Sequence, residues 1–227
     1  MLELIATNHA GEPVGTDTIT VVNESGESAA AAGDLVVSEI MYHPGDGGVE
    51  FIELLNTGEA LLDLTGVRFS QGVAFTFANG TKLAASGRLI LTEDATRFAA
   101  IYGDEIGVAG VFGDGTRLSN SGETLTLLDE SGNIIESFVY NDRGDWPATA
   151  DGEGKSLVRT ETGNDPNLAQ SWQASRVDGG MPGRDDGSVS LNPFRIKTID
   201  RTPSQGIRLV VSSQPGERYT IQFSQPL

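Results

Sequence analysis

Cysteine is absent from this 227-residue chain, and histidine occurs only as His9 and His43. The lack of cysteine excludes disulfides, thiolate metal sites and cysteine nucleophiles. The sequence also contains no nucleophile elbow of the serine hydrolases, no His-Glu-x-x-His helix and no EF-hand calcium loop. We therefore expect a protein that is not an enzyme and that needs no cofactor.

Basic side chains are scarce, because 15 Lys and Arg face 32 Asp and Glu and leave a formal net charge of −17. Residues 34–191 alone carry −15, whereas residues 1–33 carry −5 and residues 192–227 carry +3. Nucleic acids and anionic membranes are bound by basic surfaces, so neither is expected as a partner. The acidity could attract cations, but its simplest role is to keep the protein soluble.

Long apolar runs are also missing. None approaches the ~20 residues that a membrane-spanning helix needs, so membrane insertion is not expected. The first residues, MLEL, show neither the basic nor the apolar region of a signal peptide. The sequence as printed is therefore expected to contain no secretion signal of its own.

Glycine, by contrast, is abundant, with 29 residues, many of them in turn sequences such as PGDGG at 44–48 and NG at 79–80. Short segments of alternating apolar and polar residues separate these turns. This pattern predicts an all-β sandwich or barrel between residues 34 and 186. The predicted strands are residues 35–42, 50–56, 61–69, 73–77, 88–91, 124–128, 134–140 and 156–159.

A single short helix is predicted over residues 93–102. Phe98 and Tyr102 are one helical turn apart and would share a face. Thr92 is a suitable N-cap, and Gly103 is a suitable stop.

The flanks of this central region read as separate β segments. Residues 1–23 predict a hairpin, with strands at 2–7 and 18–22, that would form the end of an upstream β domain. Residues 24–33 are small and polar and predict a linker. Residues 192–227 predict a partial β module, which is short for an independent domain. We therefore expect the sequence to be part of a longer chain. The strands predicted in the last segment are 194–199, 207–211 and 219–223.

The central region resembles the lamin tail domain family over about 150 residues. Several short motifs in a fixed order carry the resemblance, and the whole set is specific although each motif is weak. Position 67 departs from the pattern, because Val67 stands where the family more often has Trp. The motifs are VSEIMYHP at 37–44, EFIELLNTG at 50–58, LDLTGV at 62–67, GTKL at 80–83, LSNSGE at 118–123, Tyr140, Trp146-Pro147, ADGEGKSL at 150–157, Trp172 and Pro182-Gly183.

This resemblance implies an immunoglobulin-like β-sandwich and a noncatalytic module. The pattern is similar to the bacterial branch of the family, which occurs in large secreted or surface proteins. An extracellular or cell-surface location is therefore expected from the resemblance. In animal lamins the domain follows a coiled-coil rod and binds nuclear partners, but this chain has no heptad rod, so those partners are not expected here.

Several acidic or glycine-rich segments invite a chemical interpretation. The sequence Gly154-Lys155-Ser156 is similar to the end of a phosphate-binding loop, but position 149 is Thr rather than the required Gly, so a turn is predicted instead. Glu39, Glu50 and Glu53 could pair as hydrolase carboxylates. Because Glu50 and Glu53 have opposite strand parity, structural bonds to backbone or arginine are favoured.

The acidic loop at 141–153 is the strongest candidate for a site. Its carboxylates suit calcium, which takes six to eight oxygen ligands, but their spacing matches no known calcium loop. The favoured alternative is that they fix the loop through backbone hydrogen bonds, as in Asx turns. The candidate ligands are Asp142, Asp145, Asp151 and Glu153.

Trp146 and Trp172 are the two tryptophans of the chain. Trp146 could form an aromatic binding surface for a sugar, although packing at the edge of the core is favoured for both residues.

The sequence as a whole favours a noncatalytic structural or protein-interaction module of a large bacterial extracellular protein. Immunoglobulin-like domains commonly act as spacers or present function on their loops. The alternative is an accessory module of a secreted hydrolase that binds polysaccharide or another polymer, with or without calcium. A third and weaker hypothesis is an enzyme, which would need a pocket with an acid–base pair. The partner and the oligomeric state do not follow from the sequence.

Overall fold

The computed structural model describes residues 2–7, 13–19, 26–184, 196–202 and 206–211. Its contacts divide the chain into two compact units, residues 26–191 and residues 1–25 together with 192–227. The second unit contains two antiparallel pairs of strands. They are β1 (Leu2–Thr7) with β2 (Pro13–Ile19), and β16 (Ile196–Thr202) with β17 (Gly206–Val211). The strand predicted at 219–223 and His9 lie outside the described residues.

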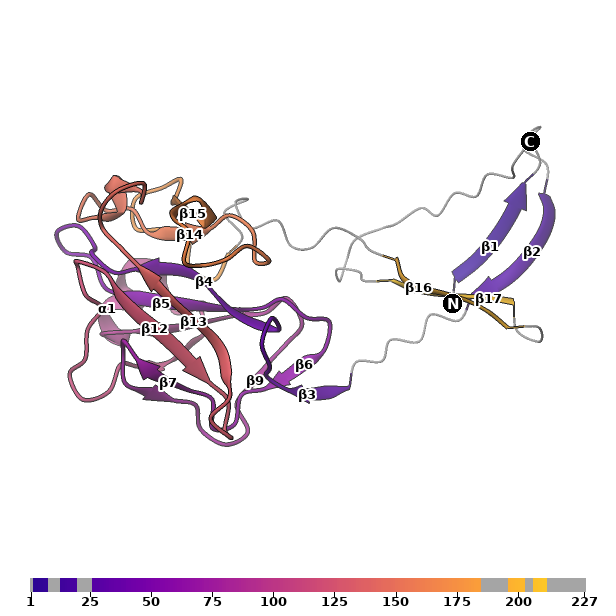
Figure 1. The fold of residues 1–227 in the computed structure, drawn as a ribbon, viewed down its shortest axis with the longest axis horizontal. Coiled ribbons are helices and arrows are strands. Elements are labelled where there is room, and N and C mark those ends of the chain that lie inside the picture. Colours follow the sequence, from indigo (N-terminus) through magenta and orange to yellow (C-terminus); the bar gives the residue numbers. More distant parts are fainter. Residues whose placement is uncertain (1, 8–12, 20–25, 185–195, 203–205, 212–227) are drawn as a thin grey trace. The chain divides into compact units, whose positions relative to one another are not determined.

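The central unit is built from three β-sheets, which confirms the prediction of an all-β sandwich (Figure 1). The larger sheet has the order β11 (Val108–Val111), β10 (Arg88–Thr92), β5 (Phe51–Asn56), β4 (Leu35–Met41), β14 (Leu157–Arg159) and β15 (Trp172–Ala174). The smaller sheet has the order β13 (Ile134–Tyr140), β12 (Glu123–Leu128), β7 (Arg68–Gln71) and β8 (Phe75–Thr76). A third sheet contains β3 (Glu27–Ala29), β6 (Leu61–Asp63) and β9 (Lys82–Leu83).

Every residue of β4 and β5 is buried, because both faces of these central strands are covered. On the inner face, Ile52 and Leu54 join the main core with side chains of the smaller sheet such as Leu125 and Leu127. On the outer face, Phe51 belongs to a second, smaller cluster beneath the helix. The alternation of side chains along a strand therefore places β5 between two apolar layers.

The helix α1 covers this outer face and spans Ala95–Tyr102. The predicted N-cap, Thr92, is wrong. The side chain of Asp94 accepts a hydrogen bond from the N–H of Arg97, whereas the Thr92 hydroxyl donates to the carbonyl oxygen of Glu50. Thr92 still belongs to β10, so the helix can begin only after the strand has ended. Gly103 ends the helix as predicted, with φ of 90° and its N–H bonded to the Ala99 carbonyl oxygen.

Several local predictions need correction. The second strand of the predicted hairpin is β2 (Pro13–Ile19) rather than residues 18–22. The strand predicted at 61–69 is two strands, β6 and β7. The Asp63 carboxylate accepts the N–H of Thr65 at 2.9 Å, and Gly66 follows with φ of 69°, so the chain turns between them. Residues 27–29, predicted as linker, form β3, which pairs with β6. Residues 108–111 form β11, whose small side chains gave no strand signal.

The two open sides of the sandwich are joined by polar contacts. On one side, Ala74 beside β8 forms a bridge with Gly113 beside β11, and the Gly113 N–H donates to the Ala74 carbonyl oxygen at 2.6 Å. On the other side, the Val139 N–H of β13 donates to the Asn167 side-chain oxygen at 3.1 Å. The strands nearest these sides are therefore not left with a full row of free backbone groups.

Gly122 provides a test of the turn before β12. Its φ is 86°, and a Cβ atom there would lie 2.4 Å from the Tyr140 carbonyl oxygen. Gly115 also has positive φ, of 67°, but a Cβ atom on it would have no neighbour within 4 Å. Gly122→Ala should therefore lower the free energy of unfolding by about 2 kcal/mol more than Gly115→Ala, since only Gly122→Ala adds a backbone clash to the strain. Urea denaturation of both variants measures the difference, and equal losses would contradict it.

Candidate functional site

The acidic loop at 141–153 lies where β13 ends and before β14 begins, next to the residues that follow β4. A short 3₁₀ turn, Ala148–Ala150, shapes it, and the buried Ala150 anchors it in the main core. The Gly152 N–H donates to the His43 carbonyl oxygen at 3.1 Å. The loop is thus attached to the chain segment after β4.

His43 and Asp151 form a half-exposed pair across this junction. The Nδ1 atom of His43 lies 2.6 Å from a carboxylate oxygen of Asp151. A Cβ atom on Gly152 would lie 3.0 Å from the imidazole ring, so a glycine lets the ring approach the backbone. The pair joins the end of β4 to the acidic loop, which the sequence did not indicate.

Tyr42 and Asp142 lie deeper in the same region. The Tyr42 hydroxyl and one carboxylate oxygen of Asp142 are two of the three buried side-chain polar atoms without a partner among the described residues. Burial raises the pKa of Tyr42, and the nearby charges of Asp151 and Asp142 raise it further. The other carboxylate oxygen of Asp142 lies 3.4 Å from Nε of Arg143. Asp142 is therefore the most buried acid of the loop, with a side chain that is 13% exposed.

The four predicted calcium ligands occupy different environments. Asp142 faces inward and Asp151 is paired with His43, whereas Asp145 and Glu153 are exposed. Within the described ranges, no three His, Cys, Asp or Glu side chains gather in a way that could hold a metal ion. The loop thus does not assemble the predicted carboxylate cluster, and calcium binding stays a prediction.

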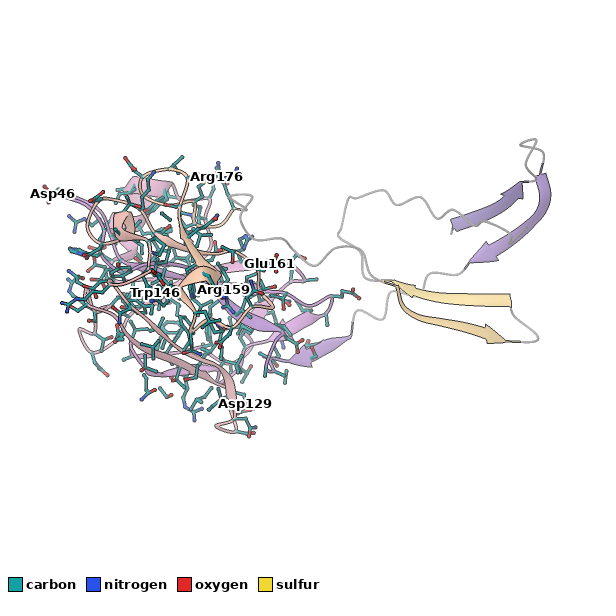
Figure 2. All side chains as sticks on the ribbon, turned by 45° about the horizontal axis from the view of Figure 1, so that its top comes forward. Asp46, Asp129, Trp146, Arg159, Glu161 and Arg176 are labelled. Carbon is teal, nitrogen blue, oxygen red and sulfur yellow. The ribbon has the colours of Figure 1, made fainter. Side chains whose placement is uncertain are left out.

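The two tryptophans stack at the edge of the core. Trp172 is buried, and its ring packs against Phe138 at 5.4 Å and against Trp146 at 6.4 Å, with ring planes 30° apart in both pairs. The indole N–H of Trp172 donates to the Pro166 carbonyl oxygen at 2.9 Å. Trp146, which is labelled in Figure 2, is only partly buried and forms the outer member of this stack. This arrangement is the edge packing that the sequence favours, and it leaves part of Trp146 accessible.

Beside this stack, Arg159 and Glu136 form an ion pair that the sequence did not indicate. An Nη atom of Arg159 lies 2.8 Å from the Glu136 carboxylate, and the Arg159 side chain is 1% exposed. Glu136 also accepts the Val37 N–H at 2.7 Å, and the Arg159 guanidinium stands 5.3 Å from the centre of the Trp172 ring. The pair therefore links β14 and β4 of the larger sheet to β13 of the smaller one. One sign of this pair is visible in the sequence, because Glu136 interrupts the apolar face of its strand.

Burial sets the ionisation of Glu136. It raises the pKa of this carboxyl above its ordinary value, while the Arg159 charge and the Val37 N–H act in the opposite direction. An ion pair in such a place is held in the charged form by its partners rather than by water.

The three glutamates that could have formed a hydrolase pair are bonded to the protein itself. Glu50 accepts the Leu118 N–H at 2.8 Å, and Glu53 accepts the Arg88 guanidinium at 3.1 Å. Glu39 accepts the Ser156 hydroxyl at 2.5 Å. These bonds agree with the structural role that the sequence favours for all three acids. Burial raises the pKa of Glu50, and the Leu118 N–H opposes this rise.

The segment that is similar to a phosphate loop is a turn into β14. Lys155 reaches the Asp178 carboxylate at 2.9 Å and the Arg176 carbonyl oxygen at 3.0 Å. Its ammonium group is thus bonded to the segment after β15.

A comparison with protein-family models matches residues 28–142 to the Lamin Tail Domain, which is just over half of the chain. This chain belongs to the lamin tail domain family. The family is noncatalytic and immunoglobulin-like, in agreement with the fold described above. A comparison with curated proteins finds no match.

The lamin tail domain of this chain extends structurally beyond the matched segment. Strands β14 and β15 follow residue 142 and complete the larger sheet next to β4. Val67, where the family more often has Trp, is buried in the main core. The smaller side chain is therefore accommodated inside the sandwich.

A helix that spans a membrane must be both long and apolar. The helices of the described segments are too short or too polar to span a bilayer.

The Arg159–Glu136 pair predicts a pH-dependent loss of stability. Arg159→Met leaves the Glu136 carboxylate buried without its cation, which should cost about 3–5 kcal/mol at pH 8. Without the arginine, the already raised pKa of Glu136 rises further, so the folded state takes up a proton as the pH falls. Protonation removes the uncompensated charge, and the loss should be smaller at pH 5.5.

Urea denaturation at the two pH values measures this effect. The double variant with Arg159→Met and Glu136→Leu is the control, because it removes both charges and should recover much of the stability at either pH. A loss for Arg159→Met that is the same at pH 8 and pH 5.5 would contradict the prediction.

Proposed function

We propose that this chain is a noncatalytic structural or protein-interaction module of a large bacterial extracellular protein. Membership of the lamin tail domain family carries the proposal. The engagement of the candidate acids supports it, since Glu39, Glu50 and Glu53 all accept hydrogen bonds from within the domain. In such a module the sandwich supplies a rigid frame, and the partner is bound by loops.

The loops at the β13–β14 end are the proposed contact surface for a protein partner. Asp145 and Glu153 are exposed there, and Trp146 offers a partly accessible ring between them in sequence. Aromatic side chains often act as anchors at protein interfaces. Glu161 lies beyond the other end of β14 and is also exposed, so it serves as a matched control (Figure 2).

A charge-reversal experiment tests the protein-interaction proposal. The 227-residue chain and its variants Asp145→Lys and Glu161→Lys are cross-linked to the intact surface of the source cell, and partners are identified by mass spectrometry. We expect Asp145→Lys to reduce capture of the main partner by about tenfold and Glu161→Lys to leave it unchanged. Protease added to intact cells should also degrade the parent protein. If both variants captured the partner equally well, the proposed contact surface would be refuted. If the parent protein were protected from the protease, the extracellular location would be refuted.

A second proposal is that the module binds polysaccharide or another polymer for a secreted hydrolase. The specific observation behind it is the partly accessible Trp146 at the edge of an acidic loop, since sugars stack on aromatic rings. Calcium could assist through Asp142 or Asp151, because this cation takes several oxygen ligands and a sugar can supply hydroxyl oxygens beside the carboxylates.

A glycan array separates the two proposals. Reproducible binding that falls at least tenfold in Trp146→Ala, but not in Ile134→Ala, would favour the polymer. Ile134 is the matched control because it is 59% exposed at the opposite end of β13. Arrays with calcium and with EDTA show whether the cation takes part, and thermal melts show whether each variant is folded. Absence of binding to any glycan in either condition would exclude these polymers.

A further inference from the structure

The segment that follows β15, residues 178–184 (the strap), lies against the outer face of β4 and β5. Two of its backbone N–H groups donate to buried carboxylates of these strands. The Met181 N–H donates to Glu39 at 3.1 Å, and the Gly183 N–H donates to Glu53 at 2.7 Å. The strap forms no strand, so these bonds replace the ladder that would otherwise attach it to the sheet.

The two carboxylates are placed directly opposite each other. Glu39 and Glu53 are partners across β4 and β5, and they are 3% and 2% exposed. Like charges in opposite positions destabilise a sheet, and burial adds to the cost. Donors must therefore surround both groups, and the strap supplies two of them. The other donors to Glu53 are the Ser38 hydroxyl, at 2.6 Å, and the Arg88 guanidinium, at 3.1 Å.

Glycine is required for the strap to approach this closely. Gly179, Gly180 and Gly183 all have positive φ, between 76° and 85°. A Cβ atom on Gly180 would lie 2.1 Å from the Glu39 carboxylate and 2.8 Å from the Ser156 hydroxyl. No other residue type could keep both the backbone conformation and the contact with the acid.

The strap is also joined to helix α1. The Tyr102 hydroxyl donates to the Gly179 carbonyl oxygen at 2.7 Å, and burial together with the Glu39 charge raises the pKa of Tyr102. Phe98 and Tyr102 pack edge-on against Phe51, each with ring centres 5.8 Å apart. Phe51 and Phe98 belong to the smaller cluster of five buried residues, against which Tyr102 packs. Its members are Met41, Val49, Phe51, Ile90 and Phe98.

We propose that the strap and α1 form one hinged cover that opens while the sandwich stays folded. The cover is held by hydrogen bonds to Glu39 and Glu53 and by the small outer cluster. The Lys155–Asp178 ion pair and the bond from the Gly179 N–H to the Gly154 carbonyl oxygen also hold it. The two sheets share the much larger main core. Segments with few buried contacts open at a lower free energy than the core. Opening exposes an apolar face of β5 and β10, with the two carboxylates at its border.

Amide hydrogen exchange of the whole chain, resolved by residue with NMR, tests the cover. In the wild type, the amides of Met181, Gly183 and α1 should exchange at least about tenfold faster than those of β12, after correction for intrinsic rates. Gly180→Ala should speed exchange in the strap and in α1 together by about tenfold or more, and leave the amides of β12 and β13 unchanged. Gly163→Ala is the control, since Gly163 has no positive φ and no atom within 4 Å of its Cβ position.

A second variant tests the hydrogen bond between the strap and a buried carboxylate. Glu39→Ala removes the acceptor of the Met181 N–H and should speed exchange in the strap and α1 in the same way, so it decides the question if Gly180→Ala does not fold. The proposal fails if the strap amides exchange only as fast as those of β12, because the cover would then open only with global unfolding. It also fails if either variant speeds exchange in the strap but not in α1, or equally throughout the domain.

Discussion

The sandwich depends on one buried ion pair between its two sheets. Arg159 on β14 and Glu136 on β13 are both removed from water. They bond to each other and to the backbone of Val37 on β4, and Arg159 also donates to the Asn164 carbonyl oxygen. Apolar side chains fill the space between the sheets, and many of these contacts tolerate replacement of one aliphatic side chain by another. The charge-assisted bond between Arg159 and Glu136 adds a contact of defined direction between the two sheets. The Arg159 guanidinium lies over the ring of Trp172, which stacks on Trp146. The ion pair is thereby in contact with the acidic loop through these two rings.

The sequence predicted what is local and missed what depends on register. Most strands follow from alternation between glycine turns, and helix α1 from the spacing of Phe98 and Tyr102. The pairing of Glu39 with Glu53 was not visible, because it depends on how β4 and β5 align across a bulge between Val37 and Glu39. The ends of elements were missed for a related reason. Asp94 caps the helix only because Thr92 is held by the sheet.

The predictions for the candidate site divide in the same way between local features, which were predicted, and contacts distant in sequence, which were missed. Composition identified the loop with Asp142, Asp151 and Trp146, and strand parity favoured a structural role for Glu50 and Glu53. Neither could show that Asp151 would turn toward His43, 108 positions earlier in the chain, instead of toward Asp145. Within the described part of the chain, the acids of this loop do not gather into a cluster of three possible metal ligands. The buried carboxylates of Glu50, Glu53 and Glu136 are instead matched to backbone N–H groups and arginines of the domain.

The closed sides of the sandwich affect how such a domain behaves beside copies of itself. An exposed strand edge is a template on which another chain can add a strand, which leads to aggregation or exchange of segments between neighbours. The Ala74–Gly113 bridge and the bond from Val139 to Asn167 occupy backbone groups at both sides. These contacts leave fewer free backbone groups on which a neighbouring copy of the chain could add a strand.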